Sequence, residues 1–202
     1  MHSIWQEQID FPVYPILKRD KKTDILYVGA TLEHAVEAHF RKEAGNAVMI
    51  IEEKSIADMS ELGGIGILRA TNMNEFKALC ILRNYIIKHH IPCDLEIISE
   101  TSIQVHPIKL FLFMTKDVEV YEQTKITSRQ GKRVDIESAY IDAGQVIEDD
   151  RPREKRYIHI FSEADFPEIT KPDILEIRKY KNNYLVLSYQ RELEGSQRYW
   201  EI

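Results

Sequence analysis

Two apolar runs separated by a charged segment predict a β-hairpin at the start of the chain. Residues 11–18 and 25–31 are rich in strand-forming side chains, and the charged segment RDKKTD lies between them. Proline has no amide hydrogen to give to a neighbouring strand, so Pro12 and Pro15 favour an edge strand or a bulge for the first of these runs. We therefore expect the fold to begin with two strands joined by a charged turn.

The following segment carries the clearest helical pattern. Apolar side chains recur at i, i+3, i+4, i+7 and i+8 from Leu32 to Phe40, which predicts one buried face of a helix. Thr31 is the expected N-cap, and Gly45 is the expected residue just past the helix end. The apolar run AVMIIEE then indicates a buried strand. This order of elements predicts an α/β layer in which the helix covers a small sheet.

The middle of the chain is predicted to be mainly helical. Regularly spaced apolar residues predict a helix over 74–90, which Pro92 ends. A shorter helix is expected over 93–100. The apolar run over 102–114 fits a helix or a strand, because periodicity does not separate the two in so short a stretch.

Beyond Thr115 the sequence is polar as far as Arg156, with one helix expected over 135–147. The apolar period then changes to two, and the runs YIHIF, ILEIRKY, YLVLSYQ and RYWEI predict short strands. The predicted fold class is therefore α/β (α+β), a small mixed sheet with covering helices followed by a β-rich C-terminal part. We expect three segments: a domain over 1–115, a mixed helical connection over 116–150 and a β-rich segment over 151–202.

Composition adds limits on location and partners. The 202 residues include 33 acidic and 27 basic side chains, which disfavours non-specific coating of nucleic acid but leaves room for a local basic site. No apolar run approaches the roughly 20 residues of a membrane helix, and no signal peptide is visible. Only Cys80 and Cys93 are present, too few for a disulfide framework. We expect a cytoplasmic protein without a membrane partner.

Three segments of the N-terminal part resemble the ParB N-terminal and sulfiredoxin-like family. They are YPILK, ILYVGATLEHAVEA and GNAVMIIEE, and the resemblance covers at most residues 10–115. It implies that Ala35 stands at the position of the family's phosphate-binding arginine, whose planar fork alanine cannot replace. His34, Glu37 and Arg69 then remain as ligand-binding candidates on a degenerate domain. The N-terminal amides of the helix could still attract an anion.

A second resemblance involves the same residues. Val13-Tyr14-Pro15 and Tyr27-Val28-Gly29 are similar to the two signatures of GIY-YIG nucleases. On that alignment Ala35 again replaces the arginine, and the metal-binding glutamate falls at Arg83, a residue that cannot hold a divalent cation. Tyr14 and Tyr27 remain as catalytic candidates, without the arginine and the metal-binding glutamate that act with the tyrosines in those nucleases.

A third possibility for chemistry is an acidic-x-Lys nuclease pattern. Asp24 with Glu52, Glu53 and Lys54 could bind a metal ion and steady a hydroxide, although the same residues also suit a solvated loop after a strand. No other set of residues predicts a metal site. Neither a Walker loop, a G-x-S-x-G elbow nor a G-x-G-x-x-G motif is present, so the sequence predicts no cofactor.

The remaining candidates are basic and aromatic. Arg129, Lys132 and Arg133 surround Gly131 and could contact nucleic-acid phosphates, or could form a solvated loop. Several aromatic side chains of the C-terminal strands could form core, a partner interface or a stacking platform: Tyr180, Tyr184, Tyr189, Tyr199 and Trp200.

Taken together, these features lead us to expect a regulatory or DNA-associated binding protein, acting without catalysis on a degenerate ParB-like scaffold. DNA or a nucleotide at a local site, and a second copy of the chain, are the expected partners. One alternative is a metal-dependent nuclease or nucleotide-acting enzyme that uses Tyr14, Tyr27 and the Glu52–Lys54 segment. Another is a protein–protein adaptor built on the C-terminal aromatic strands.

Overall fold

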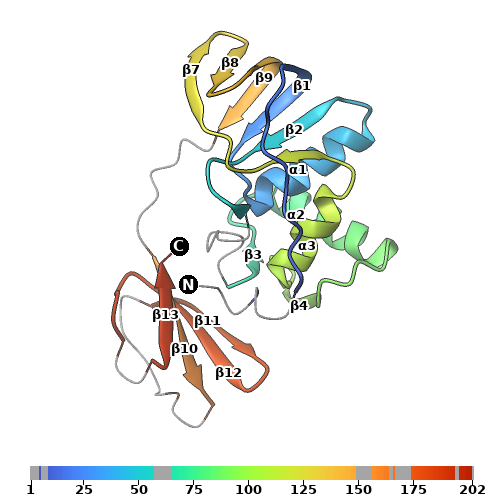
Figure 1. Cartoon of the computed structure of the whole chain (residues 1–202). Coiled ribbons are helices and arrows are strands. Elements are labelled where there is room, and N and C mark those ends of the chain that lie inside the picture. The colour runs from blue at the N-terminus through green and yellow to red at the C-terminus, as the bar shows by residue number, and fades with distance from the viewer. Residues whose placement is uncertain are drawn as a thin grey trace.

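A computed structural model describes the chain over Trp5, 9–56, 65–148, 156–163, Phe166, 174–193 and 196–201. Within these residues lie three helices and three β-sheets (Figure 1). The helices are α1 (Leu32–Glu43), α2 (Met73–Lys88) and α3 (Pro107–Thr115). The fold is α/β with a mixed sheet, covering helices and a β-rich C-terminal part, which confirms the predicted class. None of the helices in this described part is long and apolar enough to cross a membrane.

The largest sheet has six strands in the order β6-β2-β1-β9-β8-β7. Strand β1 is central and runs parallel to both of its neighbours, and β2 is also parallel to β6. Strand β8 is antiparallel to both of its neighbours, β7 and β9. The bounds of the strands are β1 Lys21–Val28, β2 Val48–Ile51, β6 Glu119–Tyr121, β7 Ile126–Gln130, β8 Arg133–Ile136 and β9 Tyr140–Glu148.

Local sequence signals explain the β1–α1–β2 unit. The Thr31 hydroxyl accepts a hydrogen bond from the backbone N–H of His34 at 3.1 Å, so Thr31 is the N-cap that the sequence predicts. Gly45 follows the helix with φ +91°, a left-handed conformation that glycine adopts without strain. All four residues of β2 are buried, as expected for a parallel strand with both faces covered.

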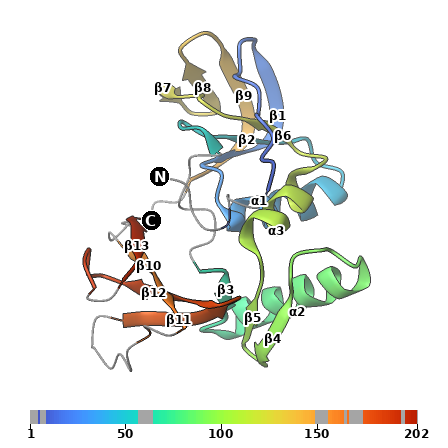
Figure 2. The same ribbon diagram turned by 60° about the horizontal axis from the view of Figure 1, so that its bottom comes forward.

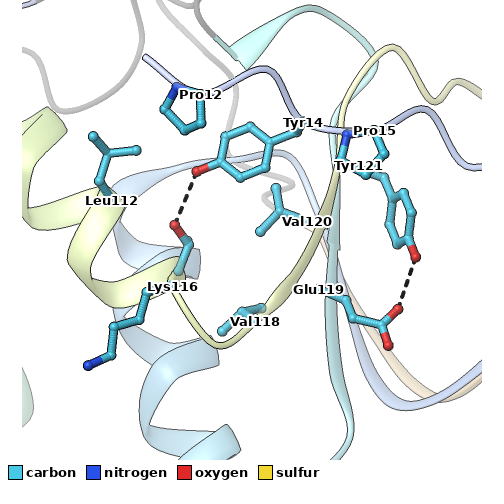
Figure 3. A pocket seen from close by; sticks show the side chains of 10 residues that line it. Pro12, Tyr14, Pro15, Leu112, Lys116, Val118, Glu119, Val120 and Tyr121 are labelled. Atoms are coloured by element: carbon cyan, nitrogen blue, oxygen red, sulfur yellow. Dashed lines mark hydrogen bonds between the residues drawn. The ribbon is translucent and has the colours of Figure 1, made fainter. Parts of the chain in front are cut away.

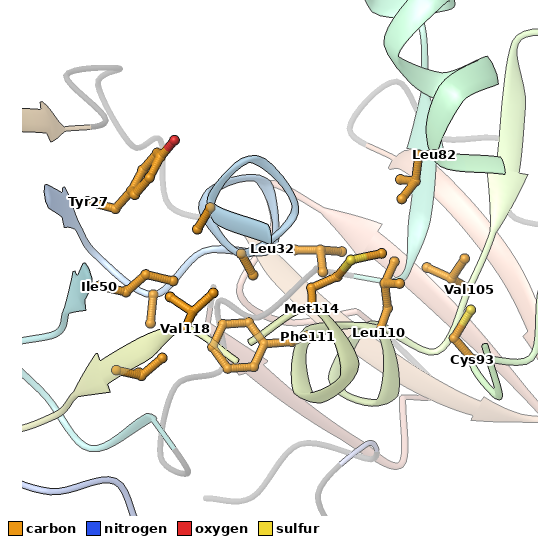
Figure 4. Packing of buried hydrophobic residues seen from close by; sticks show 14 of the residues in the cluster. Tyr27, Leu32, Ile50, Leu82, Cys93, Val105, Leu110, Phe111, Met114 and Val118 are labelled. Carbon is orange, nitrogen blue, oxygen red and sulfur yellow. The ribbon is translucent and has the colours of Figure 1, made fainter. Parts of the chain in front are cut away.

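Apolar side chains cover both faces of this sheet. On one face, Tyr27 and Ile50 pack with Leu32 of α1 and with Phe111 and Met114 of α3 (Figure 4). On the other face a separate cluster joins the alternate residues of the same strands, Leu26, Met49 and Ile51, to Val134 and Ile141. This alternation is the period-two pattern of strands, and it fixes which side chains of β1 face α1.

Two smaller sheets complete the molecule (Figure 2). One has the order β3-β5-β4, with β3 Ile67–Arg69, β4 Glu96–Ser99 and β5 Ser102–Gln104. The C-terminal sheet has the order β11-β12-β10-β13, with β10 Tyr157–Ser162, β11 Ile174–Tyr180, β12 Asn183–Ser188 and β13 Arg198–Glu201. Its strands confirm the four C-terminal runs read from the sequence. Arg69 of β3 and Glu176 of β11 form an ion pair at 3.4 Å between these two sheets.

Several predicted elements are wrong. Residues 11–18 form no strand, since Pro12 and Pro15 withhold two ladder donors, and β1 begins at Lys21 instead. The helix expected over 93–100 is strand β4, which follows a turn at Asp94 with φ +52°. The run over 102–114 holds both alternatives, β5 and then α3, and Pro107 suits the first turn of that helix.

The helix expected over 135–147 is also wrong, because this segment forms the end of β8 and nearly all of β9. Apolar residues in this segment fit the period of a helix as well as that of a strand. Pairing with β1, more than 100 residues earlier in the chain, selects the strand. The division of the chain at 115 and 150 stays a prediction.

A close approach between two strands yields a first testable prediction. Gly144 of β9 lies opposite Asp24 of β1, and a Cβ atom added to Gly144 would lie 2.7 Å from the Asp24 carbonyl oxygen. The Gly144→Ala variant should therefore lose about 1–3 kcal/mol of unfolding free energy, because the backbones must separate. Urea unfolding measures this loss.

The matched control is Gly131→Asn in the β7–β8 turn. Gly131 has φ +63° and nothing within 4 Å of an added Cβ, and asparagine tolerates this conformation. A control as unstable as Gly144→Ala, or a Gly144→Ala chain as stable as wild type, would show that the strands do not approach this closely.

Candidate ligand site at the β1–α1 turn

The candidate site lies at the carboxyl ends of β1 and β2. Both strands are parallel, and the turn from β1 into α1 occupies the edge of the sheet between them. Ligands of open α/β sheets bind outside the carboxyl ends of the strands, and the carboxyl ends of the parallel strands β1 and β2 lie together at this edge.

Glycine makes the turn after β1 tight. Gly29 has φ +96°, a conformation that favours glycine, and its N–H donates to the Ile51 carbonyl at 2.8 Å. Ala30 follows and donates its N–H to the Glu52 carboxylate at 3.0 Å. The turn is thereby tied to the end of β2 by two hydrogen bonds, one to the backbone and one to a side chain.

Glu52 is the best-positioned functional group at this edge. Its side chain is buried, with the residue 8% exposed, and its second carboxylate oxygen accepts the Lys54 N–H at 2.9 Å. A carboxylate has about four acceptor positions, so two remain after these bonds. Glu53 points outward instead and pairs with Lys125 at 2.8 Å, as expected for consecutive residues of an extended chain.

His34 and Tyr27 lie on the inner side of the turn. The His34 ring is buried; its Nδ1 is 2.7 Å from the Gly29 carbonyl oxygen and its centroid is 5.2 Å from that of Tyr27. Burial, followed by the negative charge of Glu37, raises the pKa of the Tyr27 phenol well above its ordinary value. Glu37 itself lies half-buried one turn further along α1 and pairs with Arg41 at 3.2 Å.

Tyr14 lines a different feature, an open hollow of about 590 Å³ beside α3 and β6 (Figure 3). Its hydroxyl lies 3.4 Å from the Thr115 hydroxyl, and burial is the main cause that raises the Tyr14 pKa. Tyr27 is not among the residues that line this hollow. The structure therefore does not bring the two tyrosines together as a nuclease site would require.

The basic candidates are engaged with acidic neighbours on the sheet surface. Arg129 pairs with Glu148 at 2.9 Å, and Arg133 pairs with Asp135 at 2.8 Å and lies over the Tyr140 ring. The Lys132 side chain is exposed in the turn between β7 and β8. Arg69 belongs to the small sheet and pairs with Glu176, away from His34 and Glu37 on α1.

In the described part of the chain no group of three His, Cys, Asp or Glu side chains is placed to hold a metal ion. Glu52 and Asp24, two members of the acidic-x-Lys pattern, each accept backbone amides: Asp24 takes the Ala47 N–H at 2.8 Å. Their carboxylates thus stabilise connections of the β1–α1–β2 unit. Among the C-terminal aromatic residues, the Trp200 side chain lies outside the described residues.

No family model and no curated protein matches the chain. Glycine oxidase from Bacillus cereus ATCC 14579 aligns with a TM-score of 0.56 and 12% identity, covering 81% of this chain and 70% of that protein. An L-amino acid deaminase from Proteus vulgaris lacking its specific insertion aligns with a TM-score of 0.53 and 15% identity. The alignment covers 92% of this chain and 72% of that protein.

A third match is PqsL from Pseudomonas aeruginosa, described as a probable FAD-dependent monooxygenase. It aligns with a TM-score of 0.52 and 13% identity over 84% of this chain, which spans 61% of PqsL. At such identities the likeness shows a shared fold and nothing of this chain's activity.

These findings correct the family resemblances drawn from the sequence. The ParB-like and GIY-YIG-like interpretations are wrong, because the structures that match are a glycine oxidase, an L-amino acid deaminase and a probable FAD-dependent monooxygenase. The DNA-associated regulatory function that followed from the ParB resemblance is wrong for the same reason, and the neighbours give no support to a nuclease. The short segments that suggested both families are parts of a β1–α1–β2 unit, an arrangement common to many folds.

The fold raises the question of whether this turn could hold FAD. Dinucleotide-binding turns use three glycines: one for the tight turn, one that admits the pyrophosphate, and one for close helix packing; an acidic residue at the end of the next strand binds ribose. Gly29 and Glu52 stand at the first and last of these places. Thr31 and His34 occupy the other two with buried side chains. The residues fit a ribose but do not fit the pyrophosphate of FAD.

The sequence alone singled out two of these residues for other roles. Glu52 was a candidate metal ligand and His34 a candidate ligand-binding residue, whereas Gly29 was only part of a supposed nuclease signature. A search for the complete three-glycine motif fails here because Gly29 is its one remaining glycine. The spacing of a strand, Gly29, a helix and a second strand ending in Glu52 was the usable signal.

Proposed function

We propose that this chain binds a ribonucleoside-type ligand at the carboxyl ends of β1 and β2, and that the Glu52 carboxylate accepts hydrogen bonds from the ribose hydroxyls. The observation that carries the proposal is the position of Glu52. It is buried at the carboxyl ends of the parallel strands β1 and β2, is fixed by the amides of Ala30 and Lys54, and keeps free acceptor positions.

The structural neighbours support the proposal without supplying an activity. FAD, which the description of PqsL names, contains an adenosine unit, and this chain shares the fold of that protein. The reactions of the neighbours belong to longer proteins, so we extend to this chain only the recognition of a nucleoside. We place the protein in the cytoplasm, where its free thiols Cys80 and Cys93 would stay reduced.

Calorimetric titration of the full chain with adenosine and with 2′-deoxyadenosine tests the proposal. Adenosine should bind, and loss of the 2′-hydroxyl should weaken binding by about tenfold or more, because a hydrogen bond to a charged group is lost. This comparison uses the wild-type chain alone, so it does not depend on whether a variant folds.

Substitution of the two adjacent glutamates provides the matched pair. Glu52→Gln should weaken adenosine binding by a similar factor and abolish the preference for the 2′-hydroxyl, whereas Glu53→Gln changes an exposed side chain and should leave both unchanged. Equal binding of adenosine and 2′-deoxyadenosine, or equal effects of the two substitutions, would refute the role of Glu52. Thermal unfolding of each variant confirms that the fold is retained.

A further inference from the structure

The β1–α1 turn departs from a dinucleotide-binding turn at two defined positions. Counting from Gly29, the second and third glycine positions are held by Thr31 and His34. The first of these is the N-cap of α1 and the second is the third residue of the helix. Both side chains are buried, at 9% and 7% exposure, so they fill space inside the turn.

Thr31 changes what the helix N-terminus can offer to an anion. A phosphate binds there by accepting the amide hydrogens that have no partner inside the helix. The Thr31 hydroxyl already accepts one of them, the His34 N–H, at 3.1 Å. The Ala30 N–H, just before the helix, is taken by Glu52 at 3.0 Å. Two donors that could face a pyrophosphate are therefore occupied by side chains of this chain.

His34 is fixed in the contact between helix and strand. Its Nδ1 lies 2.7 Å from the Gly29 carbonyl oxygen, and its ring packs at 5.2 Å from the Tyr27 ring of β1. Glycine at this position allows a helix to approach the first strand closely. Here the His34 imidazole fills the space that a glycine would leave empty. Its hydrogen bond with the Gly29 carbonyl holds the ring against the turn.

The charges around the turn also disfavour an anion. The segment Val28–Ala38 contains two glutamates, Glu33 and Glu37, and no lysine or arginine. Glu33 lies exposed in the first turn of α1, where its negative charge already interacts with the positive end of the helix. Glu52 adds a carboxylate at the same edge. A phosphate would meet these negative groups without a cation from the turn to offset them.

We infer that the site takes a neutral ribonucleoside and excludes its pyrophosphate esters, FAD and ADP included. This inference rests on the nucleoside binding proposed above and specifies its ligand class. Ribose hydroxyls can reach the remaining acceptor positions of Glu52, whereas the place for a pyrophosphate holds Thr31 and His34.

Competition between adenosine, ADP and FAD for the full wild-type chain is the primary test. Adenosine should bind at least tenfold more tightly than either phosphate ester. If ADP or FAD binds as tightly as adenosine, the inference is overturned while the proposed nucleoside site stands. If none of the three binds, the proposed function fails and the inference fails with it.

Two variants test the cause of the exclusion. Thr31→Gly/His34→Gly reopens the turn and should shift the adenosine-to-ADP affinity ratio at least tenfold towards ADP. Because this double variant removes an N-cap, Glu33→Gln provides a second test on an exposed residue: ADP affinity should rise about twofold to fivefold at low salt, with adenosine unchanged. The control is Glu100→Gln, which changes an exposed glutamate of the β4–β5 turn. It should change neither the ADP affinity nor the adenosine affinity. An unchanged affinity ratio in both turn variants would overturn the inference.

Discussion

Arg178→Ala is expected to cause the largest loss of stability of any single substitution considered for this chain. Arg178 lies on β11 and is 3% exposed, and its guanidinium donates to the carbonyl oxygens of Ile65 at 2.6 Å and Val105 at 2.8 Å. It also lies over the rings of Trp5 and Tyr180. One side chain of the C-terminal sheet thus fixes two backbone segments of the main body.

Truncation would leave both carbonyl groups buried and without this donor. A buried polar group that loses its partner costs about 1–3 kcal/mol, so the free energy of unfolding should fall by about 3 kcal/mol or more. Burial is the main cause that lowers the Arg178 pKa to about 10, which still leaves the guanidinium charged at neutral pH. Urea unfolding followed by far-UV circular dichroism measures the loss.

The neighbouring Lys179 supplies the control for this experiment. Its amine pairs with Glu163 on the exposed surface, and such pairs contribute at most about 1 kcal/mol. Lys179→Ala should therefore shift the urea midpoint only slightly. Similar midpoints for the two variants would show that the guanidinium of Arg178 does not join the C-terminal sheet to the body.

The second large effect is expected in the pH dependence of stability. His106 is the N-cap of α3, is 1% exposed, and accepts the Lys109 N–H at Nδ1 over 3.4 Å. Burial lowers its pKa to about 4, helped by the positive charges of Lys109 and Arg178 and opposed by Asp94. Its folded-state pKa thus lies below the value of about 6.5 in an unfolded chain.

The sign of the effect follows from which state binds the proton. Between about pH 4 and 6.5 the unfolded chain protonates this histidine and the folded chain does not, so acid favours unfolding. Lowering the pH from 8 to 5 should remove about 2 kcal/mol of unfolding free energy through His106 alone. The stabilisation is fully present above pH 6.5 and declines as the pH falls through this window.

His106→Asn isolates this contribution, since asparagine can also cap a helix but does not titrate. The difference in unfolding free energy between pH 8 and pH 5 should shrink by about 2 kcal/mol relative to wild type. His90→Asn is the control: His90 is exposed and has φ +50°, which asparagine tolerates. Identical pH profiles for wild type and His106→Asn would contradict the burial of an uncharged His106.

Local signals explain which parts of the fold were predictable. The Thr31 cap, the apolar stripe of α1 and Gly45 lie within 15 residues of one another, and each acts on this short segment of chain. The run Val48–Ile51 is apolar throughout because both faces of its strand are covered. Such features persist in any tertiary context that lets the helix cover the sheet.

The errors concern pairings between distant segments. Strand β9 joins β1 in parallel across more than 100 residues, and no local pattern in 135–147 indicates that partner. At the site, Glu52 and Glu53 are indistinguishable as adjacent acidic residues, yet the strand directs one towards the turn and the other to solvent. The family resemblances were wrong because each rested on short local matches, and the β1–α1–β2 unit that contains them is common to many folds.

Amide chemical-shift mapping during an adenosine titration tests whether the ligand binds at the β1–α1 turn beside Glu52. The experiment uses the full ¹⁵N-labelled chain and reports the position of the ligand residue by residue. We expect shifts confined to the turn Gly29–Glu33 and to Glu52–Lys54, the segments whose amides surround the proposed ribose site. Shifts centred on the hollow beside Tyr14 and Tyr121, or no shifts at saturating adenosine, would contradict this expectation.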